Sequence, residues 1–151
     1  MSNAYAKPLP QPTAASRPFW EACRRHELLV QQCLDCSAFR FPPRRLCPDC
    51  SSESAEWRRV SGRGKIHSFV VYHRLYHPAF ESDLPYNVAV VELEEGPRLL
   101  TTIVDCANEA LRCESPVEVV FDDITPDVTL PKFRPSPLSS PRWGERGVRA
   151  S

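Results

Sequence analysis

Apolar and polar residues alternate along much of this chain with the period of two that is typical of strands. This alternation, together with short runs rich in β-branched and aromatic residues, predicts strands over residues 28–32, 39–41, 55–60, 66–76, 87–93, 99–104, 117–121 and 129–133. In the longest of them, strict alternation places Ile66, Val70 and Tyr72 on one face. Phe69 and Val71 fall on the opposite face. The pattern predicts a mainly β fold.

Residues 16–26 have a different pattern, which predicts a short N-terminal helix. Ser16 is the candidate N-cap of this helix. Phe19, Trp20 and Cys23 fall on one side of it. That side has to be covered, either by the rest of the chain or by a second protein.

The C-terminal part of the chain has the strand pattern of a small closed barrel. Five strands are predicted within residues 61–135, with a long first strand, a turn at 94–98 and a helical turn at 107–114 before the fourth strand. This arrangement suits a five-stranded barrel of the OB type, with an open sandwich as the alternative. Closure removes exposed strand edges, which a chain this short cannot otherwise protect well.

Two Cys-x-x-Cys pairs lie between the strands predicted at 28–32 and 55–60. Their spacing is typical of a rubredoxin-like zinc ribbon, in which two tight turns bring four sulfurs into a tetrahedron. Iron in the same tetrahedron is the alternative. Four thiolates leave no open coordination position, so the ion is predicted to hold structure and not to activate water. The predicted ligands are Cys33, Cys36, Cys47 and Cys50.

A serine follows each cysteine pair, at Ser37 and Ser51. A glycine, which tolerates positive φ, would fit such a turn more easily. We therefore expect mild backbone strain at both serines.

Composition divides the 151 residues into four parts. Prolines recur before the first apolar cluster and after the last, so residues 1–15 and 136–151 are predicted to be tails that are disordered or ordered only against a partner. Between the tails, residues 16–60 are expected to form the helix and zinc ribbon. Residues 61–135 are expected to form the barrel.

Cysteine usage and hydropathy indicate in which cellular compartment the protein lies. No apolar run approaches the roughly eighteen residues needed to cross a bilayer, and the N-terminus lacks the pattern of a secretory signal. Seven cysteines, four of them in metal spacing, fit a reducing compartment better than a disulfide framework. The sequence predicts a cytoplasmic protein without membrane contact.

The net charge is zero, but it is unevenly divided. Residues 40–65 carry seven basic and three acidic side chains, whereas residues 79–127 carry twelve acidic and two basic ones. An OB barrel that binds single-stranded nucleic acid needs a positive groove with aromatic platforms. The acidic barrel segment disfavours binding of single-stranded nucleic acid. That function is kept as the alternative to the accessory-subunit function described below.

Several motifs together resemble a known family. They are Phe19-Trp20, the two cysteine pairs, Ser61-Gly-Arg-Gly64-Lys65-Ile66, His77-Pro-Ala-Phe80, Leu84-Pro-Tyr86, Val91-Glu-Leu-Glu-Glu-Gly-Pro-Arg98 and Leu130-Pro-Lys-Phe-Arg-Pro135. As a set, over about residues 16–135, they resemble the zinc-ribbon and OB-fold proteins associated with acyl-CoA enzymes. The chain departs from this family at residues 112–117, where the family tends to have a glycine before the strand.

The resemblance implies a non-catalytic accessory subunit with a structural zinc ion and no organic cofactor of its own. Its partner would be a thiolase-like, aldolase-like (lipid-transfer-protein-like) or hot-dog hydratase protein, with two copies of each chain, and it would help to form the acyl-CoA channel. Internal packing is the alternative role for each aromatic candidate, and simple solvation for Lys132 and Arg134. The candidate contacts to the partner or to the CoA ester are Phe19, Trp20, Arg63, Lys65, Tyr76, His77, Phe80, Tyr86, Lys132, Phe133 and Arg134, with Arg63 and Lys65 assigned to phosphate.

Independent catalysis by this chain is not favoured. His73 and His77 have carboxylates close to them in sequence, which is the raw material of an acid–base pair. No nucleophile with an evident partner accompanies them. Cys106 and Cys113 are isolated thiols and are predicted to be inert.

Overall fold

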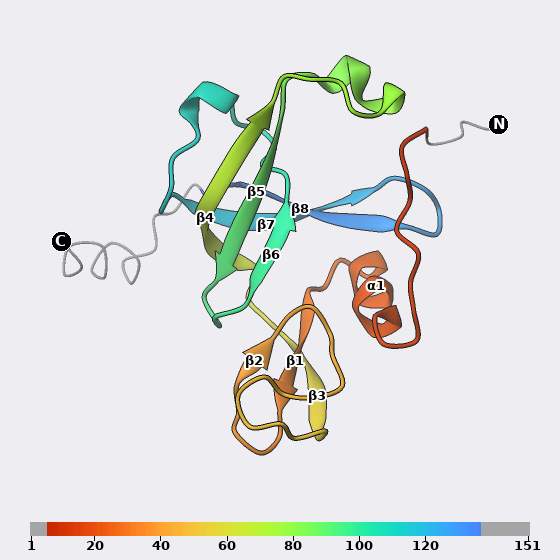
Figure 1. The fold of residues 1–151 in the computed structure, drawn as a ribbon, viewed down its shortest axis with the longest axis vertical. Helices are drawn as coiled ribbons and strands as arrows, with labels where there is room; N and C mark the ends of the chain where they lie inside the picture. The colour runs from red at the N-terminus through yellow and green to blue at the C-terminus, as the bar shows by residue number, and fades with distance from the viewer. Residues whose placement is uncertain (1–5, 137–151) are drawn as a thin grey trace.

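In the computed structural model, which describes residues 6–136, a three-stranded ribbon and a curled five-stranded sheet are accompanied by one helix, α1 (Arg17–Arg24) (Figure 1). The ribbon consists of β1 (Leu29–Cys33), β2 (Phe39–Arg40) and β3 (Ala55–Arg59), antiparallel in the order β2-β1-β3. The sheet consists of β4 (Arg63–Tyr72), β5 (Tyr86–Leu93), β6 (Arg98–Thr101), β7 (Pro116–Asp123) and β8 (Thr129–Pro135), in the order β6-β5-β4-β7-β8. Two short 3₁₀ helices, η1 (Pro78–Asp83) and η2 (Asn108–Ala110), lie in its loops.

The sheet curls until its two outer strands meet. Just beyond β6, Ile103 forms a parallel bridge to Phe133 of β8. The Val104 N–H donates to the Phe133 carbonyl over 2.8 Å, and the Phe133 N–H donates to the Thr102 carbonyl over 3.2 Å. These bonds satisfy edge groups that would otherwise face solvent. The prediction of a mainly β chain, with a zinc ribbon followed by a five-stranded OB barrel, is confirmed.

A β-bulge in β4 changes which side chains face the barrel interior. Ile66 pairs with Val91 and Ser68 with Val90, so one extra residue is inserted between these two pairs. An inserted residue shifts the alternation of every side chain that follows it. The prediction that Ile66 and Val70 lie on the same face of the strand is therefore wrong: Ile66 is 2% exposed and Val70 is 52% exposed. Phe69, assigned to the opposite face, instead packs against the core with Ile66.

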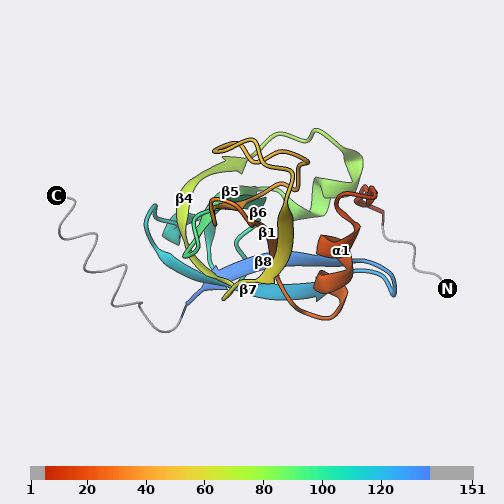
Figure 2. The ribbon, with the colours of Figure 1, turned by 90° about the horizontal axis from the view of Figure 1, so that it is seen from below.

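Helix α1 lies against β1 and β8, at the junction of ribbon and barrel (Figure 2). Its residues Phe19 and Cys23 belong to one core cluster that also holds Val30 of the ribbon and Val91 of the barrel. The apolar side of the predicted helix is therefore covered largely by this chain. Ribbon, helix and barrel share one hydrophobic core.

The helix ends at Arg24, two residues before the predicted end. His26 adopts a φ of 62°, and the Glu27 N–H donates to the Ala22 carbonyl over 2.9 Å. A left-handed residue after the last turn is a common helix stop, and the Ala22 carbonyl accepts from both Arg25 and Glu27 there.

Four further residues other than glycine have positive φ: Ser37, Ser51, Asp105 and Glu114. Ser37 and Ser51, after the two cysteine pairs, have φ of 67° and 65°, as expected for positions suited to glycine. Glu114, in the segment before β7 where the resembled family tends to have glycine, has φ of 73°. Its N–H donates to the Ile66 carbonyl over 2.7 Å, which holds the turn against β4.

Candidate functional site

The four predicted metal ligands converge in the ribbon. Their Sγ atoms all lie within 4.8 Å of one another; those of Cys33 and Cys50 are 3.5 Å apart, and those of Cys36 and Cys47 are 3.6 Å apart. A zinc ion about 2.3 Å from each of four sulfurs requires sulfur–sulfur distances of about 3.8 Å. The cluster fits a closed tetrathiolate site, which suits a structural ion.

Backbone N–H groups point at two of these sulfurs. The Cys36 N–H donates to Cys33 Sγ over 3.5 Å, and the Asp49 N–H donates to Cys47 Sγ over 3.4 Å. The Cys36 N–H is the main cause that lowers the pKa of the Cys33 thiol to about 6, and the Cys50 N–H is the main cause that lowers the pKa of Cys47. At Cys33 and Cys47 these N–H groups favour the thiolate, which is the form that binds metal, whereas the pKa values of Cys36 and Cys50 are raised.

Elsewhere, Cys23 and His77 have structural roles. Burial raises the pKa of the Cys23 thiol to about 12, so this thiol is a core group and not a nucleophile. Nδ1 of His77 accepts the Ala79 N–H over 3.1 Å and thereby caps η1. This use of His77 does not form the acid–base pair considered from the sequence.

An open apolar groove of about 990 Å³ lies where α1, the ribbon, η1 and the barrel meet. Val88 and Val90 of β5 and Leu100 of β6 line it from the barrel. Leu100 is 74% exposed, an unusual position for a leucine within a strand. Phe41 of the ribbon also lines the groove. The groove is thus an open depression with mainly apolar walls.

Five candidate contact residues line this groove: Phe19, Trp20, Phe80, Tyr86 and Lys132. The Phe80 and Tyr86 rings stack with centroids 5.3 Å apart, while Phe19 and Trp20 meet edge to face at 5.0 Å. These residues come from the helix, η1, β5 and β8. The fold therefore brings together candidates that are far apart in sequence.

Tyr76 and Phe133 lie elsewhere. Tyr76 is 67% exposed on the loop after β4, with Arg74 over its ring at 5.5 Å, and it does not line the groove. Phe133 was a candidate contact, but it is 0% exposed because the bridge to Ile103 seats it in the barrel core. The assignment of Phe133 as a surface contact is corrected to a core role.

The basic candidates are all engaged with carboxylates. Such pairing leaves less unbalanced positive charge for a phosphate than the sequence suggested, because each cation already faces an anion. The pairs are Arg63 with Glu94 (3.6 Å), Lys65 with Glu114 (2.7 Å), Lys132 with Asp122 (2.6 Å) and Arg134 with Glu118 (2.9 Å).

Sequence reasoning missed several groove residues, notably Phe41, Pro42, Val88, Val90 and Leu100. One signal was available: Leu99 and Leu100 are adjacent in a strand, so one of them must face outward. Leu99 is 3% exposed and fills the barrel, which leaves Leu100 outside. No comparable sequence pattern predicts that Phe41 and Pro42 of the ribbon line the groove.

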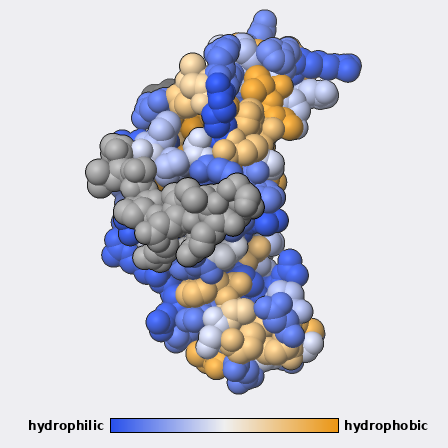
Figure 3. Space-filling model, turned by 90° about the vertical axis from the view of Figure 1, so that its left-hand side faces the viewer, coloured by the Kyte–Doolittle hydropathy of each residue, from blue (hydrophilic) through white to orange (hydrophobic). Residues whose placement is uncertain are grey.

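Exposed apolar side chains also gather at two places outside the groove. Figure 3 shows apolar surface near the upper end of the barrel and again toward the lower end of the molecule, where the ribbon lies. At the end of β4, Val70 and Leu75 are 52% and 41% exposed; in the ribbon, Leu34 and Leu46 are 56% and 40% exposed. None of these four residues lines the groove.

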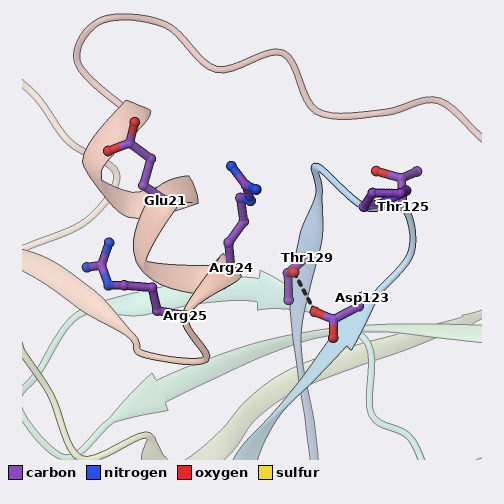
Figure 4. A pocket seen from close by; sticks show the side chains of 7 residues that line it. Glu21, Arg24, Arg25, Asp123, Thr125 and Thr129 are labelled. Carbon is purple, nitrogen blue, oxygen red and sulfur yellow. Dashed lines mark hydrogen bonds between the residues drawn. The ribbon is translucent and has the colours of Figure 1, made fainter.

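A second, polar pocket of about 550 Å³ lies between the end of α1 and the β7–β8 hairpin (Figure 4). It is lined by Glu21, Arg24 and Arg25 from the helical side and by Asp123, Thr125, Pro126 and Thr129 from the hairpin. Asp123 is occupied: it accepts from the Thr129 hydroxyl over 2.6 Å and contacts His26 Nε2 at 3.0 Å. Charges of both signs give the pocket no preference for one kind of ligand.

Across residues 6–136, no helix is both long enough and apolar enough to span a membrane.

Family comparisons match both parts of the chain. Residues 20–56 match the ChsH2 rubredoxin-like zinc ribbon domain, and residues 57–122 match the ChsH2 C-terminal OB-fold domain. A probable enoyl-CoA hydratase alpha subunit of Thermomonospora curvata is 40% identical over 119 residues, which are 78% of this chain and 37% of that protein. The chain thus spans little more than a third of that relative's length.

A DUF35 domain-containing scaffold protein of Methanothermobacter thermautotrophicus is 39% identical over 99 residues, which cover 65% of this chain and 74% of that protein. A solved structure described as the Ltp2-ChsH2(DUF35) aldolase superposes with a TM-score of 0.76 at 37% identity, covering 83% of this chain and 98% of the matched chain. The chain therefore belongs to the ChsH2/DUF35 family of zinc-ribbon and OB-fold proteins.

Proposed function

We propose that this protein is a non-catalytic accessory subunit that docks on a thiolase-like, aldolase-like or hydratase partner and helps to form the acyl-CoA channel of that enzyme. The observation that carries the proposal is the apolar groove, in which five independently selected contact candidates meet. The names of its relatives, a hydratase alpha subunit and an aldolase complex, support a partner of this class.

The groove has the composition of a protein-binding surface. Trp20 and Tyr86 are of the aromatic types enriched at interface hot spots, and Leu100 offers a large apolar side chain to whatever covers it. Leaving such a surface in contact with water costs about 25 cal/mol for each Å² of apolar area. Docking a partner on the groove would remove this cost.

The zinc site has a structural role in this proposal. The ribbon carries Phe41 to the groove, and the shared core connects the ribbon to α1 with Phe19 and Trp20. An ion held by four thiolates would fix the ribbon and, through it, one wall of the groove. Metal-spaced cysteines also suit a reducing compartment, so we place the complex in the cytoplasm.

The channel role follows from the position of the groove at the meeting point of four elements. A partner that covers an open groove converts it into an enclosed passage, and its apolar walls suit an acyl chain better than a charged ligand. Lys132 stands at the rim beside Asp122, where it can contact a polar group of the ester. We propose two copies of each chain, as expected for docking on a symmetric dimer.

The decisive experiment is co-expression with a thiolase-like, aldolase-like or hydratase protein encoded beside this chain. Co-purification at equal stoichiometry, with CoA-ester turnover lost when this chain is omitted, would support the proposal. A chain that folds, retains zinc and joins none of these partners would contradict it.

Single-stranded nucleic-acid binding is the alternative function, and it has a separate test. Because the basic candidates are ion-paired and residues 79–127 are strongly acidic, we expect no retention on immobilised single-stranded DNA near physiological salt. Tight binding that falls steeply with added salt would favour the alternative.

A further inference from the structure

The segment before the helix, residues 6–15, forms an N-terminal strap that runs from α1 toward η1 (Figure 1). Lys7 and Pro8 of the strap are themselves groove-lining residues. Lys7 forms an ion pair with Asp83 of η1, and its ammonium lies over the Phe80 ring, 5.2 Å from the centroid. The strap thus meets the groove at its aromatic end.

The other end of the strap is fixed at the start of the helix. The Thr13 N–H donates to Ser16 Oγ over 2.9 Å, and the Arg17 N–H donates to the Thr13 carbonyl over 2.9 Å. Ser16 occupies the N-cap position, but its hydroxyl bonds to Thr13 and makes no cap bond to the helix. The serine predicted as an N-cap therefore anchors the strap.

Between these two anchors the strap is loosely held. Pro8, Pro10 and Pro12 fix φ in an extended range and have no backbone N–H, so they donate no hydrogen bond that could hold the strap in place. Leu9 is 42% exposed. The Lys7–Asp83 ion pair is partly exposed, with 28% and 38% of the two side chains accessible to solvent, and ion pairs near the surface shift an equilibrium by about fivefold or less. The prolines also limit the freedom that the strap gains on release.

We infer that the N-terminal strap is the occupant of this end of the groove in the free chain, and that a docking partner must displace it. The strap covers Phe80 and contributes its own apolar groups to the groove, so strap and partner compete for one surface. A weak anchor suits that exchange, because a tightly held strap would block docking. The competition rests on the proposed function, whereas strap closure in the free chain does not.

The test uses the full chain and a charge exchange. Lys7→Asp and Asp83→Lys each place like charges opposite each other and should open the strap, and the double variant should close it again. The readout is binding of the neutral apolar fluorophore N-phenyl-1-naphthylamine to the purified chain. We expect each single variant to bind it about threefold more tightly. The double variant should lose most of this gain, since it restores the ion pair but not the contact of the Lys7 ammonium with the Phe80 ring.

Two controls locate the effect. Arg45→Asp, which breaks an exposed ion pair with Glu53 in the ribbon, should leave fluorophore binding unchanged. Adding Leu100→Glu to Lys7→Asp should abolish the gain, because Leu100 lines the groove. Equal fluorophore binding in all charge variants, or a gain that persists undiminished in the double variant, would overturn the inference.

Partner binding separates the two proposals. If the single variants associate faster with the partner enzyme than the unmodified chain does, strap competition is supported. If the partner binds all variants equally and the fluorophore binds them equally, the strap inference fails while the accessory-subunit function stands. If the fluorophore responds as expected but no acyl-CoA enzyme binds any variant, strap closure is supported and the proposed function fails.

Discussion

The imidazole ring of His26 lies flat against the phenyl ring of Phe121, with centroids 5.2 Å apart and an interplanar angle of 10°. Through Nε2, the same imidazole contacts Asp123 Oδ1 at 3.0 Å, and Asp123 also accepts from the Thr129 hydroxyl. His26 follows α1, whereas Phe121 and Asp123 belong to β7. The contact therefore fastens the helix to the barrel hairpin, 97 residues away in sequence.

Because of this contact, we expect the free energy of unfolding to depend on pH in the acidic range. The Thr129 hydroxyl, and then His26, hold the pKa of Asp123 below its ordinary value. A lowered folded-state pKa means that the stabilisation is present above the unfolded pKa of about 3.9 and is lost as pH falls through the folded value. We expect the stability gap between the unmodified chain and Asp123→Asn to shrink below about pH 4. Urea unfolding of both chains at several pH values measures it, with Glu21→Gln, in the same pocket, as the control.

Replacing a metal ligand should remove both the ion and the fold of the ribbon. Structural zinc contributes about 10–16 kcal/mol to small zinc domains, which is comparable with the whole stability of a chain this size. Cys47→Ser should therefore lack zinc in a colorimetric metal assay and lose the cooperative thermal transition, because the ribbon shares its core with α1 and the barrel. Cys106→Ser, outside the cluster, should keep one equivalent. A folded Cys47→Ser chain that retains the metal would refute this assignment.

Relieving the positive φ of the serines should stabilise the chain. Ser37 and Ser51 sit at φ of 67° and 65°, a conformation that costs an ordinary residue about 1–2 kcal/mol and glycine little. After the extra entropy of the unfolded glycine chain is subtracted, each Ser→Gly substitution should add about 1 kcal/mol to the free energy of unfolding of the metal-loaded chain. The control is Ser68→Gly, an exposed strand position in β4, which should be destabilising. If neither substitution raises the free energy of unfolding, the positive φ of Ser37 and Ser51 does not strain the folded chain.

Introducing a charged side chain into the groove should weaken binding to the partner enzyme without unfolding the chain. Because Leu100 is 74% exposed, Leu100→Glu should leave the thermal midpoint nearly unchanged while weakening partner association by about tenfold or more. Isothermal titration with the partner enzyme measures the affinity. Val70→Glu is the matched control, since Val70 is a 52% exposed apolar residue of β4 in the same sheet but does not line the groove. Equal losses in both variants would argue against the groove as the docking surface.

Local patterns were sufficient for much of the fold. The spacing of Cys33, Cys36, Cys47 and Cys50 predicted a metal cluster, because each pair forms its own turn and the two turns are close in sequence. Period-two alternation located the strands of ribbon and barrel for the same reason: it depends on neighbouring residues alone. The strain at Ser37 also followed from the turn that the pair requires.

Long-range packing decided the rest. The bulge after Ile66 depends on how β4 pairs with β5, so no reading of β4 alone could place Val70 outside. The burial of Phe133 depends on barrel closure, and the ion pairs of Lys65 and Lys132 depend on which carboxylate the fold brings opposite.

The sequence by itself determined the zinc-ribbon ligands, the strands and the aromatic candidates, because these follow from residue type and short spacing. Only the tertiary structure decided that Trp20, Phe80 and Tyr86 line one groove, and that Lys7 lies across its end. A groove is a relation between surfaces of separate elements, and its shape is set by the core that packs those elements together.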